Sequence, residues 1–330
     1  MTPLYRNVHI IINPASGSDE PILNPINDVL HQFELKWEAH ITHQAGDATR
    51  LTAEALDAGA DLIVSYGGDG TLMEVINGLV GHDVPLALLP GGTGNGVALA
   101  MGIPKDLRQA LMLIGNSSTN AKDGDLARRR KLDVARCNDR YFIQRAFVGL
   151  SKEYIPDRQM KDSVGFLAYP ISALRFIAEQ PAIRYRINID DIVFEEDGIL
   201  CLVNNVGYSN SDRLRDIAER AFLEVQVHEG DNTDTTDGTV LDKITPDDGL
   251  LDVVLLTDTQ TILGSILSLP LRNKGSALAK AHLFQGKHVS ISTTPSETIT
   301  LDGEDGGKTP ADIELIPGAI EIIVPAEASA

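Results

Sequence analysis

The sequence predicts an α/β domain followed by an antiparallel β-sandwich domain. Up to residue 131, short apolar runs alternate with segments whose apolar residues recur at helical spacing, a pattern typical of parallel strands joined by helical crossovers. From about Leu132 the apolar segments are short, often rich in Val and Ile, and separated by polar turns, as in an antiparallel sandwich. The length of 330 residues favours roughly two domains. We therefore expect domains at 1–131 and 132–330.

The first domain should alternate strand and helix from its start. Its expected elements are a strand at 8–12, a helix at 21–33, a strand at 36–42, a helix at 47–57, a strand at 61–66, a helix after residue 70 and a strand at 85–89. The helix at 47–57 is expected to begin at a capping Asp47 and to end at Gly59.

The second domain should consist mostly of strands. These are expected at 132–137, 141–148, 183–194, 199–206, 222–228, 250–256, 287–293, 297–301 and 319–324. Two helical stretches are expected to interrupt them, around 164–179 and around 261–283. The acidic segment at 224–248 should form an exposed loop or hairpin.

Glycines concentrate at the end of the strand expected at 61–66. Gly67, Gly68 and Gly70 surround Asp69, and apolar residues then resume at helical spacing. Glycine tolerates backbone angles closed to other residues and lets a ligand approach the main chain, so this corner suggests a phosphate cradle. Thr71 and Glu74 are expected to form a capping box at the helix start. A capped turn without a ligand is the alternative that this corner alone leaves open.

A second glycine corner, PGGTGNG at 90–96, follows the strand expected at 85–89. Two corners after neighbouring strands can enclose the phosphates of one nucleotide from two sides. In a parallel sheet, ligands bind beyond the carboxyl ends of the strands, where both corners should lie. The sequence therefore predicts a nucleotide site at this edge.

The composition excludes several classes of protein. A net charge of -19 argues against a nucleic-acid partner, which binds by having its phosphates neutralised by Lys and Arg. Cys137 and Cys201 lie far apart without metal-ligand spacing, which argues against a disulfide framework or a zinc site. With no leader at the start and no apolar stretch of the roughly 18 residues that a membrane span needs, we expect a cytoplasmic protein.

Five motifs together resemble the diacylglycerol kinase catalytic family, which includes bacterial lipid kinases, sphingosine kinases and ceramide kinases. They are INPASG at 12–17, GGDGTLMEVINGL at 67–79, LPGGTGNGVALAMGIP at 89–104, DDGLLDVVLL at 247–256 and LDGE at 301–304. The resemblance covers nearly the whole chain. It implies a Rossmann-like domain of the NAD kinase and diacylglycerol kinase type, followed by a β-sandwich that receives the lipid.

The resemblance also implies ATP-dependent phosphorylation of a lipid hydroxyl, of diacylglycerol or a sphingoid-type lipid, in the cleft between the domains. The residues that match the family's nucleotide site are Asn13, Thr42, Gly68, Asp69, Gly70, Thr71, Leu72, Met73, Glu74 and Thr93. Asp69 is the expected organiser of the Mg²⁺ that accompanies ATP, because magnesium prefers one or two carboxylates with phosphate oxygens and water. Its alternative role is to hydrogen-bond the amides of its own turn.

In the resembling enzymes, the aspartate that corresponds to Asp302 takes the proton from the lipid hydroxyl, and Glu304 helps to hold metal or nucleotide. Taken alone, the Asp302–Gly303 pair is equally the choice of an ordinary β-turn. The family's second metal position matches Asp248, with the main-chain oxygens of Thr245 and Leu250, and would hold a structural Mg²⁺. A solvated acidic loop is the alternative there.

One departure from the family concerns the second corner. Many bacterial members carry Asp after the Asn of this corner, whereas Gly96 follows Asn95 here. Two other functions therefore stay open: an NAD kinase, whose family shares the first corner, and a nucleotide-binding or lipid-binding protein without catalysis. The expected partner is a lipid at a membrane surface, reached by transient peripheral contact, and the resemblance is compatible with a homodimer.

Overall fold

The computed structural model describes residues 4–17, 21–118, 126–149, 181–205, 223–229, 232–235, 249–257 and 279–326. The chain divides into two compact units. The first unit combines Met1–Val134 with Ile316–Ala330, and the second contains Ala135–Leu315.

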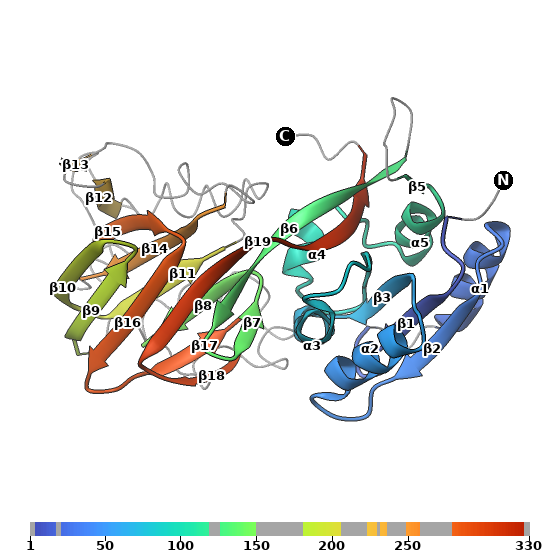
Figure 1. Ribbon diagram of the computed structural model, residues 1–330, viewed down its shortest axis with the longest axis horizontal. Coiled ribbons are helices and arrows are strands. Elements are labelled where there is room, and N and C mark those ends of the chain that lie inside the picture. The colour runs from blue at the N-terminus through green and yellow to red at the C-terminus, as the bar shows by residue number, and fades with distance from the viewer. Residues whose placement is uncertain are drawn as a thin grey trace, which may run out of the picture. The chain divides into compact units, whose positions relative to one another are not determined.

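The first unit is built on a parallel sheet in the order β19-β4-β3-β1-β2 (Figure 1). Its elements are β1 (Val8–Ile12), α1 (Leu23–Gln32), β2 (Trp37–Ile41), α2 (Asp47–Asp57), β3 (Leu62–Gly67), α3 (Asp69–Leu79), β4 (Leu86–Pro90), α4 (Gly96–Ala100), α5 (Leu107–Gly115), β5 (Ser117–Ser118) and the first part of β6 (Ala127–Cys137). The second part of β19 (Ala311–Pro325) completes it. The alternation predicted from the sequence is confirmed.

Burial explains why these strands form a parallel sheet. Every residue of β1 and of β3 is buried, which requires cover on both faces of the sheet. The helices provide it in two pairs, α1 with α5 and α2 with α3. β2 is the edge strand, and three of its five residues are exposed. The carboxyl ends of β1, β2, β3 and β4 consequently lie along one edge of the sheet.

The C-terminal segment 316–330 groups with the first unit, whereas the expected boundary placed 132–330 in one domain. β19 explains the difference, because Ile322 pairs in parallel with Leu86 of β4. Ile322, Ile323 and Val324 are at most 1% exposed. A segment more than two hundred residues away from β4 in sequence thus completes the parallel sheet of the first unit.

The second unit is a β-sandwich. Its elements are the end of β6, β7 (Arg140–Phe142), β8 (Arg145–Val148), β9 (Ile183–Ile189), β10 (Ile192–Gly198), β11 (Leu200–Asn204), β12 (Leu223–Glu229), β13 (Asn232–Thr235), β14 (Leu251–Leu256), β15 (Ala279–Gly286), β16 (His288–Thr294), β17 (Thr298–Leu301), β18 (Glu304–Lys308) and the start of β19. One sheet has the order β13-β12-β15-β14-β11-β8-β17-β18, and β10-β9-β16-β19 belong to the other.

Side chains from both sheets form the core of the sandwich. Phe194 of β10 packs against Phe284 of β15 with ring centroids 4.9 Å apart, and the Tyr185 hydroxyl of β9 donates to the Val148 carbonyl of β8 at 3.0 Å. In the described part of the first of these sheets neighbouring strands are antiparallel except β12 and β15, which are parallel, and the neighbours in β10-β9-β16-β19 are antiparallel. The predicted fold class, an α/β domain followed by a β-sandwich, is confirmed.

Four expectations for the second unit had different outcomes. The segment 183–194 is not one strand but a hairpin of β9 and β10, because the chain turns at Asp190, whose φ is 47°. Residues 279–283 belong to β15, so the helix expected around 261–283 is wrong there, and its remainder lies outside the described residues. The helix expected around 164–179 also lies outside them. Within the acidic segment, β12 and β13 form the expected hairpin.

Among the described residues, no helix combines the length and apolar character needed to cross a membrane.

Candidate functional site

The first glycine corner, residues 67–70, joins β3 to α3. A Cβ on Gly67 would lie 2.6 Å from the Cβ of Thr71, so only glycine fits beneath the first turn of the helix. Gly68 is the N-cap of α3, and no side chain caps that helix start. The first amide N–H groups of a helix have no intrahelical acceptor, and they favour anions. This 11-residue helix therefore presents an open anion-binding end.

The capping box expected from Thr71 and Glu74 is wrong. The Thr71 hydroxyl accepts a hydrogen bond from Asn13 Nδ2 at 2.9 Å, and a Glu74 oxygen accepts one from the amide of Ala48 at 3.0 Å. Both side chains thus bind partners outside their own helix. Asp47 likewise does not cap α2 as expected: Gly46 is the N-cap, and the Asp47 carboxylate accepts from the amides of His43 and Gln44 in the preceding turn.

The second glycine corner, residues 91–96, joins β4 to α4. Asn95 adopts a left-handed conformation with φ 52°, its Oδ1 accepts from the Gly92 amide at 2.9 Å, and its Nδ2 donates to the Gly92 carbonyl. This arrangement folds the loop into a compact turn. Asn95 was not among the predicted site residues, although its position between glycines was a signal for a left-handed residue.

The two corners touch each other. β3 and β4 are parallel neighbours, and the Gly91 amide donates to the Gly67 carbonyl at 2.9 Å. A Cβ on Gly92 would lie 2.5 Å from the Cα of Gly68. Any side chain at Gly92 would therefore push the corners apart. Both corners thus lie at one edge of the sheet, as the sequence predicts.

Asp69 connects the corners through its carboxylate. It accepts hydrogen bonds from the amide of Gly96 at 3.0 Å and of Val97 at 3.3 Å, at the start of α4. The expected alternative was that Asp69 binds amides of its own turn, whereas these two amides belong to the other corner. Each of its two oxygens accepts one of these bonds.

Other predicted nucleotide residues lie at the same sheet edge. Asn13 follows β1, and its main-chain N–H donates to the Tyr66 carbonyl at 3.0 Å. Thr42 follows β2, and its main-chain N–H donates to the Ile12 carbonyl at 2.9 Å. Thr93 is exposed on the second corner. Leu72 is only 6% exposed and packs in the core, so it can offer a ligand little beyond its main chain. Gly70 is exposed, and Met73 is half-buried.

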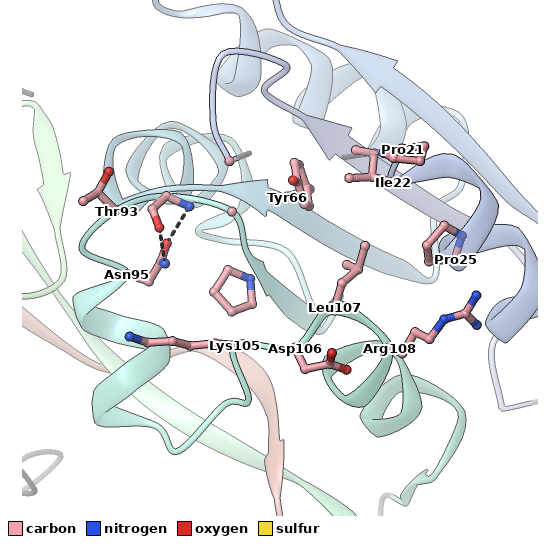
Figure 2. Close-up of a pocket in the computed structure, with 14 residues that line it drawn as sticks. Pro21, Ile22, Pro25, Tyr66, Thr93, Asn95, Lys105, Asp106, Leu107 and Arg108 are labelled. Atoms are coloured by element: carbon pink, nitrogen blue, oxygen red, sulfur yellow. Dashed lines mark hydrogen bonds between the residues drawn. The ribbon is translucent and has the colours of Figure 1, made fainter. Parts of the chain in front are cut away.

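A cavity of about 550 Å³ opens beside the second corner (Figure 2). Pro21, Ile22 and Pro25 line one side of it, and the segment 105–108 lines the opposite side. The remaining lining residues are Gly17, Tyr66, Pro90, Gly91, Gly92, Thr93 and Asn95.

Tyr66 and Lys105 are among the cavity residues that the sequence analysis did not predict. The Tyr66 ring is packed by two glycines: a Cβ on Gly17 would lie 2.7 Å from its hydroxyl oxygen, and one on Gly91 3.0 Å from the ring. Lys105 is exposed at the rim and has no ion-pair partner within the described ranges, whereas Arg108 pairs with Asp28 at 3.0 Å. No motif pointed to Lys105, because an isolated surface lysine carries no signal in a sequence.

Asp302 lies in the second unit, at the hairpin between β17 and β18. Asp302 and Gly303 form its two-residue loop with φ 48° and 92°, the backbone that an Asp–Gly turn favours. The carboxylate accepts hydrogen bonds from three consecutive amides, those of Ile143 at 2.8 Å, Gln144 at 2.9 Å and Arg145 at 2.7 Å. Burial raises the pKa of Asp302 to about 6, although these amides oppose the shift. Glu304, the first residue of β18, is exposed.

The predicted second metal position is only partly described. Leu250 is half-buried and precedes β14, and Gly249 beside it has φ 76°. Thr245 and Asp248 lie outside the described residues.

Comparisons with known proteins agree with this architecture. Residues 7–126 match the family model described as diacylglycerol kinase catalytic domain, and residues 238–324 match the one described as YegS C-terminal NAD kinase beta sandwich-like domain. A diacylglycerol kinase of Staphylococcus saprophyticus is 29% identical over an alignment of 330 positions. The alignment covers 98% of this chain and 96% of that protein. A diacylglycerol kinase of Staphylococcus aureus is 28% identical over an alignment of 331 positions, which covers 98% of this chain and 93% of that protein.

A solved structure described as a putative diacylglycerol kinase from Bacillus anthracis strain Sterne has the same fold. It aligns with a TM-score of 0.71 at 24% identity and covers 99% of this chain and 97% of that one. A second structure from that strain aligns with a TM-score of 0.68 at 23% identity, covering 99% of both chains.

Proposed function

Because this chain belongs to the diacylglycerol kinase catalytic family, we propose that it transfers the γ-phosphoryl group of ATP to the hydroxyl group of a diacylglycerol or sphingoid-type lipid. The observation that carries the proposal is the contact between the two glycine corners at the uncapped start of α3. Phosphoryl transfer depends on positioning and charge neutralisation more than on covalent chemistry. Main-chain amides on two sides of a triphosphate supply the positioning.

The nucleotide would bind along the edge formed by the strand ends. The open amides of α3 would receive phosphate oxygens, and Gly68 and Gly92 keep this surface free of side chains. Asn13 is held by its bond to Thr71, so its orientation is fixed before a ligand arrives. Lys105, at the rim of the neighbouring cavity, would add a positive charge to an otherwise acidic chain.

Asp69 fits the demands of Mg²⁺, which binds one or two carboxylates together with phosphate oxygens and water. The two amide bonds to Gly96 and Val97 fix its carboxylate at the junction of the two corners. When bound, Mg²⁺ would neutralise the charge that develops on the phosphates. A second, structural Mg²⁺ at Asp248, Thr245 and Leu250 belongs to the same proposal.

Asp302 would act as the general base, with Glu304 beside it. Among the described residues its Oδ2 accepts only from the Ile143 amide, so that oxygen retains a direction in which to receive a proton. A pKa of about 6 leaves the carboxylate mostly ionised at neutral pH and makes it a stronger base than an ordinary aspartate. The proton of the lipid hydroxyl would move to Oδ2 as the phosphoryl group arrives, since a carboxylate cannot ionise an alcohol beforehand.

The test is a panel of acceptors incubated with the full chain, Mg²⁺ and γ-labelled ATP in mixed micelles. The acceptors are diacylglycerol, monoacylglycerol, sphingosine, ceramide, undecaprenol and NAD. We expect label in one lipid class and its loss in Asp302→Asn. Conversion of NAD to NADP without lipid labelling would make the chain an NAD kinase. Binding of ATP without labelling of any acceptor would indicate a protein that binds nucleotide without catalysis.

A further inference from the structure

Three metal-ligand side chains gather on the edge of the parallel sheet, away from the glycine corners. His9 of β1 is the register partner of Glu38 of β2, and His40 follows two residues later. Side chains two residues apart on a strand point to the same face, so all three share one face of the β1–β2 pair. One ligand atom from each lies within 4.8 Å of the other two.

Hydrogen bonding alone leaves this cluster incomplete. His9 Nδ1 lies 2.8 Å from His40 Nε2, and the rings stack with centroids 5.0 Å apart. His9 is only 1% exposed, and its Nε2 has no hydrogen-bond partner among the described residues. The nitrogen of His9 that faces His40, and that can serve as a ligand there, is therefore Nδ1.

The carboxylate of Glu38 completes the cluster, because one of its oxygens lies within 4.8 Å of a nitrogen of each histidine. Two imidazole nitrogens that face each other next to a carboxylate are a donor set for a metal ion.

We propose that His9, Glu38 and His40 bind one divalent transition metal ion of the Zn²⁺ class. Two imidazoles and one carboxylate match the three protein ligands of an open tetrahedral zinc site. Water would take the fourth position, because Glu38 is exposed and His40 is half-buried. Imidazole ligands suit Zn²⁺, Co²⁺, Ni²⁺ and Cu²⁺ rather than Mg²⁺. The site is thus chemically distinct from the proposed Mg²⁺ at Asp69, and it does not depend on the proposed kinase activity.

Metal binding requires the two rings to separate slightly and to turn. Zn–N bonds of about 2.0–2.1 Å at a tetrahedral angle place two nitrogens about 3.3 Å apart. The Nδ1–Nε2 pair would therefore open by roughly half an ångström from its hydrogen-bonded 2.8 Å, and the rings, whose nitrogens now face each other, would turn so that both lone pairs point to the ion. His40 can provide this movement, because it lies on β2, at the edge of the described sheet. The metal would then tie β2 to the buried strand β1.

The test uses the full chain after treatment with a chelator. Equilibrium dialysis against Zn²⁺ in excess Mg²⁺ should give one Zn²⁺ per chain. Trp37 is the chain's one tryptophan and precedes Glu38, so Co²⁺ should quench its fluorescence with the same stoichiometry, and Zn²⁺ should reverse the quenching. Bound Co²⁺ should also show the intense visible absorption of a tetrahedral site. The thermal unfolding temperature should rise with Zn²⁺ concentration.

Variants at the exposed and half-buried ligands keep the test clear of misfolding. Glu38→Gln and His40→Gln should each weaken Co²⁺ and Zn²⁺ binding by more than about 10-fold. His82→Gln, at an exposed histidine after α3, should bind as the unaltered chain does. Absence of stoichiometric binding, or equal binding by His40→Gln, would overturn the proposal and leave the two histidines as a hydrogen-bonded pair.

Discussion

The Asp302 carboxylate accepts hydrogen bonds from three consecutive amides, two in the connection between β7 and β8 and one at the first residue of β8. The same residue adopts the left-handed backbone of a two-residue hairpin loop. Both features serve the fold of the second unit whether or not a lipid is present. A catalytic role therefore has to be separated from this structural one by measurements that respond differently to each.

The first prediction concerns Asp302→Asn. An asparagine keeps an oxygen for Gln144 and Arg145 but turns an NH₂ group toward the Ile143 amide, so we expect unfolding free energy to fall by about 1 kcal/mol. Kinase activity should fall by about 10²- to 10⁴-fold, because the base is lost. ADP affinity, measured by calorimetry, should not change. Asp305→Asn, at an exposed carboxylate three residues later, is the control; a comparable loss of activity there would contradict the assignment.

The second prediction is a pH dependence. Because the pKa of Asp302 is raised to about 6, kcat/KM should decline as the pH falls through about 6. Stability should respond with the opposite sign. A carboxyl group whose pKa is higher in the folded state stabilises the fold fully below its unfolded pKa of about 3.9, and this contribution is lost as pH rises through about 6. Rate profiles and thermal unfolding between pH 4 and pH 8 check both; a flat rate profile would count against Asp302 as the base.

At the scale of elements, the site depends on how two strand-to-helix corners fit together. Helix α4 contains only five residues and starts at a left-handed Asn95, so its position is set by contacts rather than by its own stability. Those contacts are the bonds of Asp69 to its first amides and the approach of Gly92 to Gly68. The departure at Gly96 fits this arrangement, since its main-chain amide is what Asp69 binds.

The third prediction tests the contact between the corners. Gly92→Ala places a Cβ about 2.5 Å from the main chain of Gly68, which cannot be relieved without separating the corners. We expect ADP to bind at least about 10-fold more weakly by calorimetry, a change of about 1.4 kcal/mol. Gly81→Ala is the control: its φ of 92° makes the alanine strained, but its surroundings are open. It should lose about 1–2 kcal/mol of stability and retain ADP affinity; equal weakening would show a nonspecific effect.

At the scale of the whole molecule, the chain passes between its two units within β6 and within β19. The C-terminal part of β19 adds a strand to the sheet that carries both glycine corners, next to β4. Folding of the first unit therefore needs residues from both ends of the sequence. Its stability should respond to changes near the C-terminus.

The fourth prediction concerns this closing strand. Ile322→Ala removes a side chain that is 1% exposed and should lower unfolding free energy by about 2–4 kcal/mol. The loss should appear in thermal unfolding of the full chain, and bound ADP should still raise the unfolding temperature, because the corners are unchanged. Val193→Ala, at a 57% exposed strand residue of the second unit, should change stability by less than about 0.5 kcal/mol. Equal effects would mean that β19 does not support the first unit.

Local sequence patterns were sufficient for much of this molecule. The alternation of apolar runs predicted β1 to β4 and the helices between them, and α2 covers the predicted range 47–57. The glycines at 67–70 and 91–96 predicted two corners at one sheet edge, and Asp302–Gly303 predicted a tight hairpin. These features depend on backbone angles and on side-chain periodicity within a few residues, which are written directly in the sequence.

Only the tertiary structure decided which distant groups meet. It placed Asn13 against Thr71, Asp69 on the start of α4, three amides around Asp302, and His9 beside His40. It also gave residues 316–330 to the first unit and turned 279–283 into a strand. Periodicity tells which face of an element is apolar but not which partner covers it. Partner choice follows from the burial and hydrogen bonding of the entire chain, because each buried polar group must find its acceptor or donor wherever the fold brings one.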